Sequence, residues 1–466
     1  MGGAQRGRCG LTRPAPAVVI SLALMAAACG GATSDDEAIA RGVSTTAAPT
    51  SSTVPSTTTT TEPPCPPSPV DGEPVPEALR TSLGQGLVRL VAAAPGSQFT
   101  ASIRIDGYGE VLAHEPDLAL SPASNQKLLT AYGALTTLDL FRGLTTTVST
   151  SAELDVAGNV AGDLVLAAGG DPTLTTRGPH SLSALADQVA ASGLTSVSGR
   201  VVLDDTRHES ILIPSGWPDF QVPRFGGPLS VLMVDDNEAR SDTAFLADPG
   251  LEHTATFARL LADRGIVVSG GVARTDAATE RTGPTDPTVL ASVESAPVGS
   301  LIGDLLLNSD NESADLLLRE VGVVASGQGT LDAGAARVQE VFASRCIDLV
   351  GGFGDGSGVS LDNLRSAREL RRIVDLFLVD PLGPAVLDSL PVAAETGTLS
   401  GRFVGTSAAG VLTAKSGSII GGKAMSGVTR TTDGRTATFS IVVNGPDAAD
   451  ATAAIDALLV RLSDPL

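Results

Sequence analysis

Similar runs of strand and helix patterns stand at both ends of the folded part of this 466-residue chain. The first end has a helix-like pattern and two strand-like runs joined by an Asp-Gly turn, at residues 78–93, 99–105 and 110–113. The second end has three strand-like runs and a closing helix, at residues 410–414, 424–430, 436–443 and 448–462. This order lets the two ends share one antiparallel sheet with helices packed against it.

The long middle contains two kinds of pattern. Residues 148–288 alternate short strands with turns, as at residues 162–166 and 199–203, whereas helix-like spacing returns at residues 298–307 and 314–323. The sequence therefore predicts an α+β domain made of residues 76–147 and 289–466. It predicts that an inserted mainly-β domain, residues 148–288, interrupts that domain.

The N-terminus has the layout of an export signal. Three arginines precede an apolar run at residues 15–28, and small residues lead to Cys29. We predict a signal peptide at residues 1–29. Cys29 also stands where a bacterial lipobox has its lipidated cysteine, although leucine is usual where Ala26 stands. Residues 30–75 are rich in Ser, Thr and Pro, which predicts an extended linker, either a tether from a membrane or a plain disordered tail.

Composition excludes several classes of function. The formal net charge of -21 leaves no basic surface for nucleic acid. The four histidines do not have zinc-ligand spacing, and neither a phosphate-binding loop nor a dinucleotide-binding turn occurs. We therefore predict that the protein uses no metal or cofactor. The histidines are His114, His180, His208 and His253.

Lysine is rare in this chain. Only Lys127, Lys415 and Lys423 stand against 28 arginines. Arginine cannot be deprotonated in a protein, whereas a desolvated lysine can lose its proton and act as a base. The rarity of lysine therefore suggests a chemical role for the motifs that contain Lys127 and Lys415.

The first motif is Ser124-Asn125-Gln126-Lys127, at the start of a helix predicted over residues 124–138 with Ser124 as its cap. Residues three apart lie on one face of a helix, so the lysine amine can reach the serine hydroxyl. Such a tetrapeptide is common and is weak evidence alone.

Two further motifs follow along the chain. Ser309-Asp310-Asn311 lies between the two middle helices, where it could present polar side chains to a cleft or simply form a turn. Lys415-Ser416-Gly417-Ser418 ends the strand-like run at 410–414. There the lysine cation and the serine hydroxyl on an edge strand could bind a substrate carboxylate. Alternatively, the motif is a solvated strand end. The order and the elements of the three motifs are the signature of serine β-lactamases and penicillin-binding proteins.

With these motifs the chain resembles the D-alanyl-D-alanine carboxypeptidases/endopeptidases of the class C low-molecular-mass penicillin-binding proteins. The resemblance runs from about residue 78 to the end and includes four further segments. These are residues 169–174, 204–207, 355–358 and 397–399. Serine at position 416 replaces the usual threonine but keeps a hydroxyl. The insertion is shorter than in larger members.

The resemblance implies a β-lactamase/transpeptidase-like domain and a role for each motif. Ser124 would be the nucleophile, Lys127 its base, Ser309 a proton relay, and Asn311 a ligand of the substrate amide. Lys415 and Ser416 would bind the terminal carboxylate, and Gly417 would allow close approach of the backbone. The backbone N–H groups of Ser124 and Ser418 would form an oxyanion hole.

The expected substrates are peptidoglycan peptides ending in D-Ala-D-Ala, and β-lactams are the expected inhibitors. The expected location is the outer face of the cytoplasmic membrane, the periplasm or the cell wall. A true β-lactamase and a non-catalytic wall-binding protein remain as alternatives, and a cross-link endopeptidase activity is also open.

The cysteines predict one disulfide. Cys9 and Cys29 belong to the signal region, which leaves Cys65 and Cys346 in the exported remainder. An oxidising compartment lets two such cysteines pair. We predict a Cys65–Cys346 bond that attaches the end of the linker to the folded domain, with an intermolecular bridge or free thiols as the alternatives.

Overall fold

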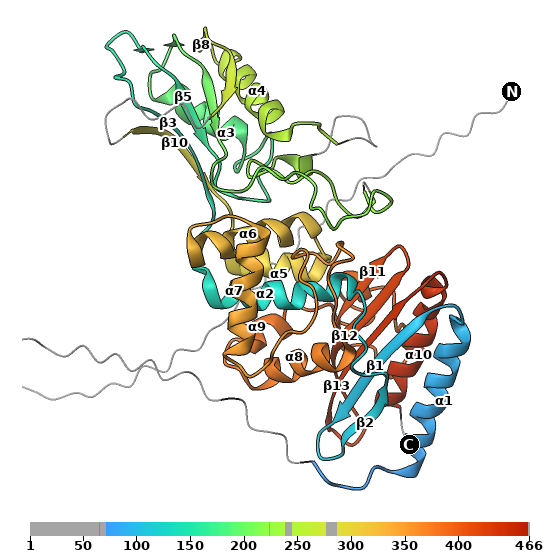
Figure 1. The fold of residues 1–466 in the computed structure, drawn as a ribbon. Helices are drawn as coiled ribbons and strands as arrows, with labels where there is room; N and C mark the ends of the chain where they lie inside the picture. Colours follow the sequence, from blue (N-terminus) through green and yellow to red (C-terminus); the bar gives the residue numbers. More distant parts are fainter. Residues whose placement is uncertain (1–64, 66–70, 223, 238–244, 276–286, 465–466) are drawn as a thin grey trace, which may run out of the picture. The chain divides into compact units, whose positions relative to one another are not determined.

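The structure is a computed structural model that describes Cys65 and residues 71–222, 224–237, 245–275 and 287–464 (Figure 1). The predicted signal peptide, Cys29 and nearly all of the predicted linker lie outside these residues. None of the helices in the described ranges is long and apolar enough to cross a membrane.

One five-stranded antiparallel sheet joins the two ends of the described chain, in the order β11-β12-β13-β1-β2 (Figure 1). Its strands are β1 (Gln98–Ile105), β2 (Gly109–His114), β11 (Thr413–Ile419), β12 (Gly422–Arg430) and β13 (Thr436–Asn444). Strand β1 pairs along its whole length with β13, the central strand, and the register runs from Gln98 opposite Asn444 to Ile105 opposite Ala437. The predicted sheet is thus confirmed, with β11 at its edge.

Helices cover both faces of this sheet. Helices α1 (Glu77–Ala93) and α10 (Ala451–Ser463) pack together on one face, where Ile103 and Phe439 belong to the same apolar core as Leu458. Helix α8 (Ala367–Val379) contacts β1 and β13 on the other side. Seven of the eight residues of β1 are buried, because burial on both faces removes the usual alternation of apolar and polar residues.

A helical region surrounds α2 (Gln126–Thr137), whose first ten residues are all buried. The helices around it are α5 (Val298–Asn308), α6 (Asn311–Ser326), α7 (Leu331–Ala343) and the short α9 (Gly383–Leu387). The ring of Tyr132 on α2 packs 5.2 Å from Phe342 and 5.3 Å from Phe377, measured between ring centroids. The apolar spacing that predicted this helix is therefore its core-facing stripe.

The start of α2 differs from the prediction in one detail. Ser124 is not its N-cap: it lies within a 3-10 turn, η1 (Ala123–Asn125), that leads directly into the helix. Neither Asn125 nor another side chain caps α2, and the Ser124 hydroxyl instead accepts a hydrogen bond from Lys127. The serine is thus available to the cleft described below.

The middle of the chain builds a second five-stranded sheet, in the order β10-β3-β5-β7-β9, and a small sheet, β4-β6-β8. The strands are β3 (Thr145–Thr150), β4 (Asn159–Val160), β5 (Leu164–Ala167), β6 (Ser196–Val197), β7 (Val201–Asp204), β8 (Val267–Val268), β9 (Val272–Arg274) and β10 (Thr288–Glu294). The chain enters through β3 and leaves through its antiparallel neighbour β10. Residues 148 and 288, the predicted limits of the insertion, lie in these two strands.

This region also contains two helices that the sequence analysis did not predict, α3 (Leu182–Ala191) and α4 (Pro249–Ala262). They are required by topology, because β5, β7 and β9 run parallel and parallel neighbours need a long crossover. Start signals were present in the sequence. The Ser181 hydroxyl accepts from the Ala184 N–H at 3.0 Å, and the Asp248 carboxylate accepts from the Leu251 N–H at 3.1 Å.

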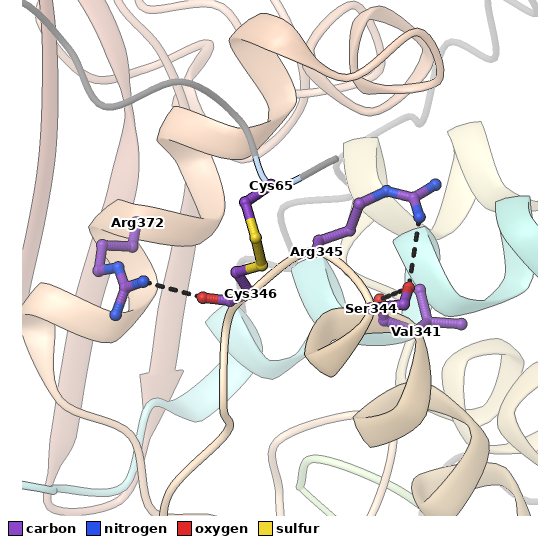
Figure 2. The surroundings of a disulfide bond; sticks show 6 residues. All are labelled: Cys65, Val341, Ser344, Arg345, Cys346 and Arg372. Atoms are coloured by element: carbon purple, nitrogen blue, oxygen red, sulfur yellow. Dashed lines mark hydrogen bonds between the residues drawn. A yellow bond between two sulfur atoms is a disulfide. The ribbon is translucent and has the colours of Figure 1, made fainter. Parts of the chain in front are cut away.

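The predicted disulfide is confirmed (Figure 2). Cys65 and Cys346 are bonded, with their Cα atoms 5.6 Å apart and a sequence separation of 281. Cys346 lies just beyond α7, and its carbonyl accepts a hydrogen bond of 3.1 Å from Arg372 of α8. The bond attaches the chain before α1 to the helical region.

Candidate active site

The three motifs meet at one cleft of about 430 Å³. The turn η1, the α5–α6 loop and the edge strand β11 each contribute to its wall. Its lining residues are Ser124, Phe225, Ser309, Asn311, Thr398, Arg402, Ser416, Gly417, Ser418, Lys423, Ala424, Thr452 and Ile455. Most of them are polar, and six come from the motifs.

Lys127 is fully buried beneath Ser124. Its Nζ donates to Ser124 Oγ at 3.3 Å, to Asn311 Oδ1 at 2.5 Å and to the Ser357 carbonyl at 2.6 Å. Burial lowers the pKa of Lys127 to about 8, although the charges of Asp315 and Asp355 oppose the shift. A lysine with such a pKa can accept a proton near neutral pH, which an arginine could not do.

The second motif uses its residues in two ways. Ser309 ends α5 with a left-handed φ of 64°, and the Asp310 carboxylate caps α6 by accepting from the Ser313 N–H at 2.7 Å. Asp310 is therefore structural, while Ser309 and Asn311 on either side of it line the cleft. Both ends of the Asn311 amide are engaged, since its oxygen accepts from Lys127 and its nitrogen donates to the Phe225 carbonyl. Each end keeps capacity for one more hydrogen bond.

The third motif lies inside β11 and not at its end, because the strand begins at Thr413. Ser416 and Ser418 line the cleft, as strand alternation requires. Lys415 is fully buried behind them and donates to Ser309 Oγ at 2.8 Å and to the Ser416 carbonyl at 3.0 Å. Burial, and to a lesser degree the nearby charge of Lys127, holds the pKa of Lys415 well below its usual value.

Gly417 lets β11 lie directly against the serine turn. A Cβ at this position would stand 2.9 Å from the side-chain nitrogen of Asn125 and 3.0 Å from both the Pro122 carbonyl and the Ala123 Cβ. Contacts of this kind with backbone cannot be relieved by a side-chain rotation. The glycine therefore lets β11 pack closely against η1, the turn that contains Ser124.

The loop at residues 355–358 belongs to the segments that carry the family resemblance, but the sequence does not predict which residue it contacts. Its Ser357 carbonyl is a partner of Lys127. The Asp315 carboxylate holds this loop by accepting from the N–H groups of Gly356 at 2.6 Å and Ser357 at 3.2 Å. Asp315 follows the second motif by one helical turn, but the residues around it do not predict which loop its carboxylate binds.

A segment of the middle region also reaches the cleft. The indole N–H of Trp217 donates to Asp355 at 2.7 Å, and the Gln221 amide oxygen accepts from the Ile420 N–H at 3.2 Å. The Phe225 carbonyl, as noted, accepts from Asn311. This segment therefore joins the 355–358 loop, the β11–β12 turn and the start of α6, and its Phe225 lines the cleft.

A second junction between the middle region and α6 is a buried ionic cluster around Glu320. Its carboxylate accepts from Arg207 Nε at 2.7 Å and Nη2 at 2.5 Å, and it lies 2.6 Å from His208 Nε2. Gly170 packs against it so closely that a Cβ there would meet Glu320 Oε1 at 2.3 Å. Residues 169–174 and 204–207, noted in the sequence, thus converge on one side chain.

The chain is similar to known proteins both in sequence and in structure. The chain matches the D-Ala-D-Ala carboxypeptidase 3 (S13) family over residues 95–255 and 239–464. It is 30% identical over 430 residues to the D-alanyl-D-alanine carboxypeptidase of Actinomadura sp. (strain R39), covering 76% of this chain and 79% of the relative. It is also 30% identical over 423 residues to carboxypeptidase DacB of Mycolicibacterium smegmatis, covering 85% and 88%.

Among solved structures, penicillin binding protein 4 (dacB) from Haemophilus influenzae aligns with a TM-score of 0.69 at 20% identity, over 77% of this chain and 93% of that one. This likeness confirms the predicted β-lactamase/transpeptidase-like fold. Together with the sequence matches, it identifies the chain as a serine-type peptidase of the D-Ala-D-Ala carboxypeptidase 3 (S13) family.

Proposed function

We propose that the protein removes the terminal residue from peptides ending in D-Ala-D-Ala through an acyl-enzyme on Ser124. The observation that carries this proposal is the position of Lys127, buried with its Nζ 3.3 Å from Ser124 Oγ. In the first step Oγ attacks the carbonyl carbon of the penultimate D-alanine, and Lys127 takes the hydroxyl proton. An ester bond to Ser124 forms as the peptide C–N bond breaks.

The other motif residues complete the reaction in this proposal. Ser309 lies in hydrogen-bond contact with Lys415 and relays a proton to the leaving amine, while Asn311 holds the substrate amide. The N–H groups of Ser124 and Ser418 stabilise the oxyanion, and Ser416 with Lys415 recognises the terminal carboxylate. Water then cleaves the ester and returns the proton to Ser124.

We further assign residues 76–147 and 289–466 to the catalytic domain and residues 148–288 to an insertion. Phe225, which lines the cleft and whose carbonyl accepts from Asn311, supports a role for this insertion in the wall of the cleft. The basic, apolar and small-residue pattern before Cys29 supports export to the cell envelope, with a lipid anchor at Cys29 as the finer proposal. Metabolic labelling with palmitate, comparing the wild type with Cys29→Ser, tests the anchor.

Penicillin provides the test of the central proposal, since β-lactams mimic the D-Ala-D-Ala end and acylate the same serine. Mass spectrometry of the benzylpenicillin-treated protein should place one adduct on the peptide that contains Ser124, and Ser124→Ala should show none. An adduct on another peptide would contradict the mechanism. Rapid nitrocefin turnover would instead indicate a β-lactamase, and digestion of purified peptidoglycan would separate release of D-alanine from cleavage of cross-links.

A further inference from the structure

All three lysines of this lysine-poor chain come together at one cleft. Lys127 and Lys415 are fully buried, and neither lines the cleft. Lys423, to which the sequence motifs give no role, does line it. It stands on β12, and burial, with help from the charges of Arg402 and Arg224, lowers its pKa from the usual value.

Lys423 faces the same part of the cleft as the hydroxyls of the third motif. It lies opposite Ser418 in the β11–β12 register, and its Nζ donates to Ser418 Oγ at 2.6 Å. Ser416 lies two residues back on the same face of β11. Because Ser418 Oγ accepts from the lysine, its own O–H proton is free to be donated to a third group.

No acidic side chain among the described residues neutralises the charge of Lys423. Over the described ranges it makes no ion pair, and its Nζ donates a hydrogen bond to a neutral hydroxyl, that of Ser418. Arg402, the other cation lining the cleft, is paired with Asp456 through two hydrogen bonds. An unpaired ammonium half-buried beside two hydroxyls is a site for a carboxylate.

We propose that Lys423 is a specificity-determining residue whose ammonium binds the free carboxylate of the substrate's leaving amino acid. This inference rests on the proposed function and deepens it. The carboxylate would accept hydrogen bonds from Lys423 and from the hydroxyls of Ser416 and Ser418, all of which line the cleft. Lys415 lies behind the strand, where it bonds to Ser309 and to the Ser416 carbonyl and so positions both residues without lining the cleft.

The test pairs Lys423→Gln with two ligands that differ only at the carboxylate, benzylpenicillin and its methyl ester. Acylation of Ser124 is followed by mass spectrometry, and the second-order rate constant is measured for each. A hydrogen bond to a charged group predicts that benzylpenicillin acylation falls by ~10-fold or more, while acylation by the ester changes by less than about twofold. Lys423→Arg, which keeps the charge, should recover part of the loss with benzylpenicillin alone.

Arg430→Gln is the matched control, because it removes one positive charge from the same strand away from the cleft. It should leave both rate constants unchanged. Equal losses with the acid and the ester in Lys423→Gln would overturn the inference, since the lysine would then only position Ser418. No loss with either ligand would overturn it as well. If neither ligand acylates the wild type, the proposed function itself is wrong.

Discussion

The Nζ of Lys127 lies 2.5 Å from Oδ1 of Asn311, although the two residues have a sequence separation of 184. This bond connects the helix that carries the candidate base to the helix that begins with the second motif. It also orients the Asn311 amide, whose nitrogen then reaches the Phe225 carbonyl. The lysine is thus held by acceptors on three different segments, and its proton affinity depends on all of them.

Replacing Lys127 by arginine should lower the rate of acylation by benzylpenicillin at least ~10²-fold, since the charge remains but the proton acceptor is lost. Burial sets the pKa of Lys127 to about 8, and the base is the neutral amine. The wild-type rate should therefore rise with pH up to about 8 and level off above it. Stopped-flow acylation over pH 6–10, at ~25 °C, measures both effects. A near-normal rate in the variant would show that the lysine serves only as a charge.

Gly417→Ala should impair acylation with little loss of folded structure. The new methyl would stand within 3.0 Å of the Pro122 carbonyl and 2.9 Å of the Asn125 amide, so β11 must move away from the serine turn. A displacement of about 1 Å at a reacting centre can cost ~10²-fold in rate. Gly401→Ala is the control, because a Cβ there meets nothing within 4 Å. Equal acylation rates in the two variants would contradict the close approach.

Glu320→Gln should lower the free energy of unfolding by roughly 3 kcal/mol, the lower end of the cost of breaking a buried ion pair, as Arg207 is partly exposed. Burial raises the pKa of Glu320, but hydrogen bonds from His208 and Arg207 outweigh it, so the net pKa is lowered. This stabilisation is complete above the unfolded pKa of about 4.3 and is lost as the pH falls through the lower folded value.

Urea unfolding as a function of pH tests this prediction. The difference between wild type and Glu320→Gln should shrink below about pH 4. Glu340→Gln removes a carboxylate from an exposed pair with Arg337 and should change stability by less than about 1 kcal/mol. A pH-independent difference would show that packing, and not ionisation, is what Glu320 provides.

Replacing both Cys65 and Cys346 by serine should destabilise the protein by about 2–5 kcal/mol, because the bond closes a very long loop in the unfolded chain. Denaturant unfolding with and without reductant measures this. Reductant should lower the stability of the wild type and leave that of the double variant unchanged. Peptide mapping that finds both cysteines alkylated without reductant would contradict the bond in the exported protein.

Several features were predictable because short-range patterns carry them. The Ser124–Lys127 spacing places both groups at one helix turn, and the strand and helix patterns near the two chain ends predicted the shared sheet. The Cys65–Cys346 pairing followed from counting, since only two cysteines lie beyond the signal region. In the middle region Asp248-Pro249 is a local helix-start signal, with Asp248 as the N-cap and Pro249 at the first helical position. The short strands and turns around it favour β structure, so the local pattern alone does not predict α4.

The sequence by itself determined the family, the sheet formed by both chain ends and the three motifs of the cleft. Only the tertiary structure decided which partners those motifs have. Lys423 faces Ser418 because of cross-strand register, and Ser357 accepts from Lys127 because Asp315 holds its loop. These contacts join residues far apart in the chain, and their choice depends on how whole elements pack together. No local pattern of residue types records that packing.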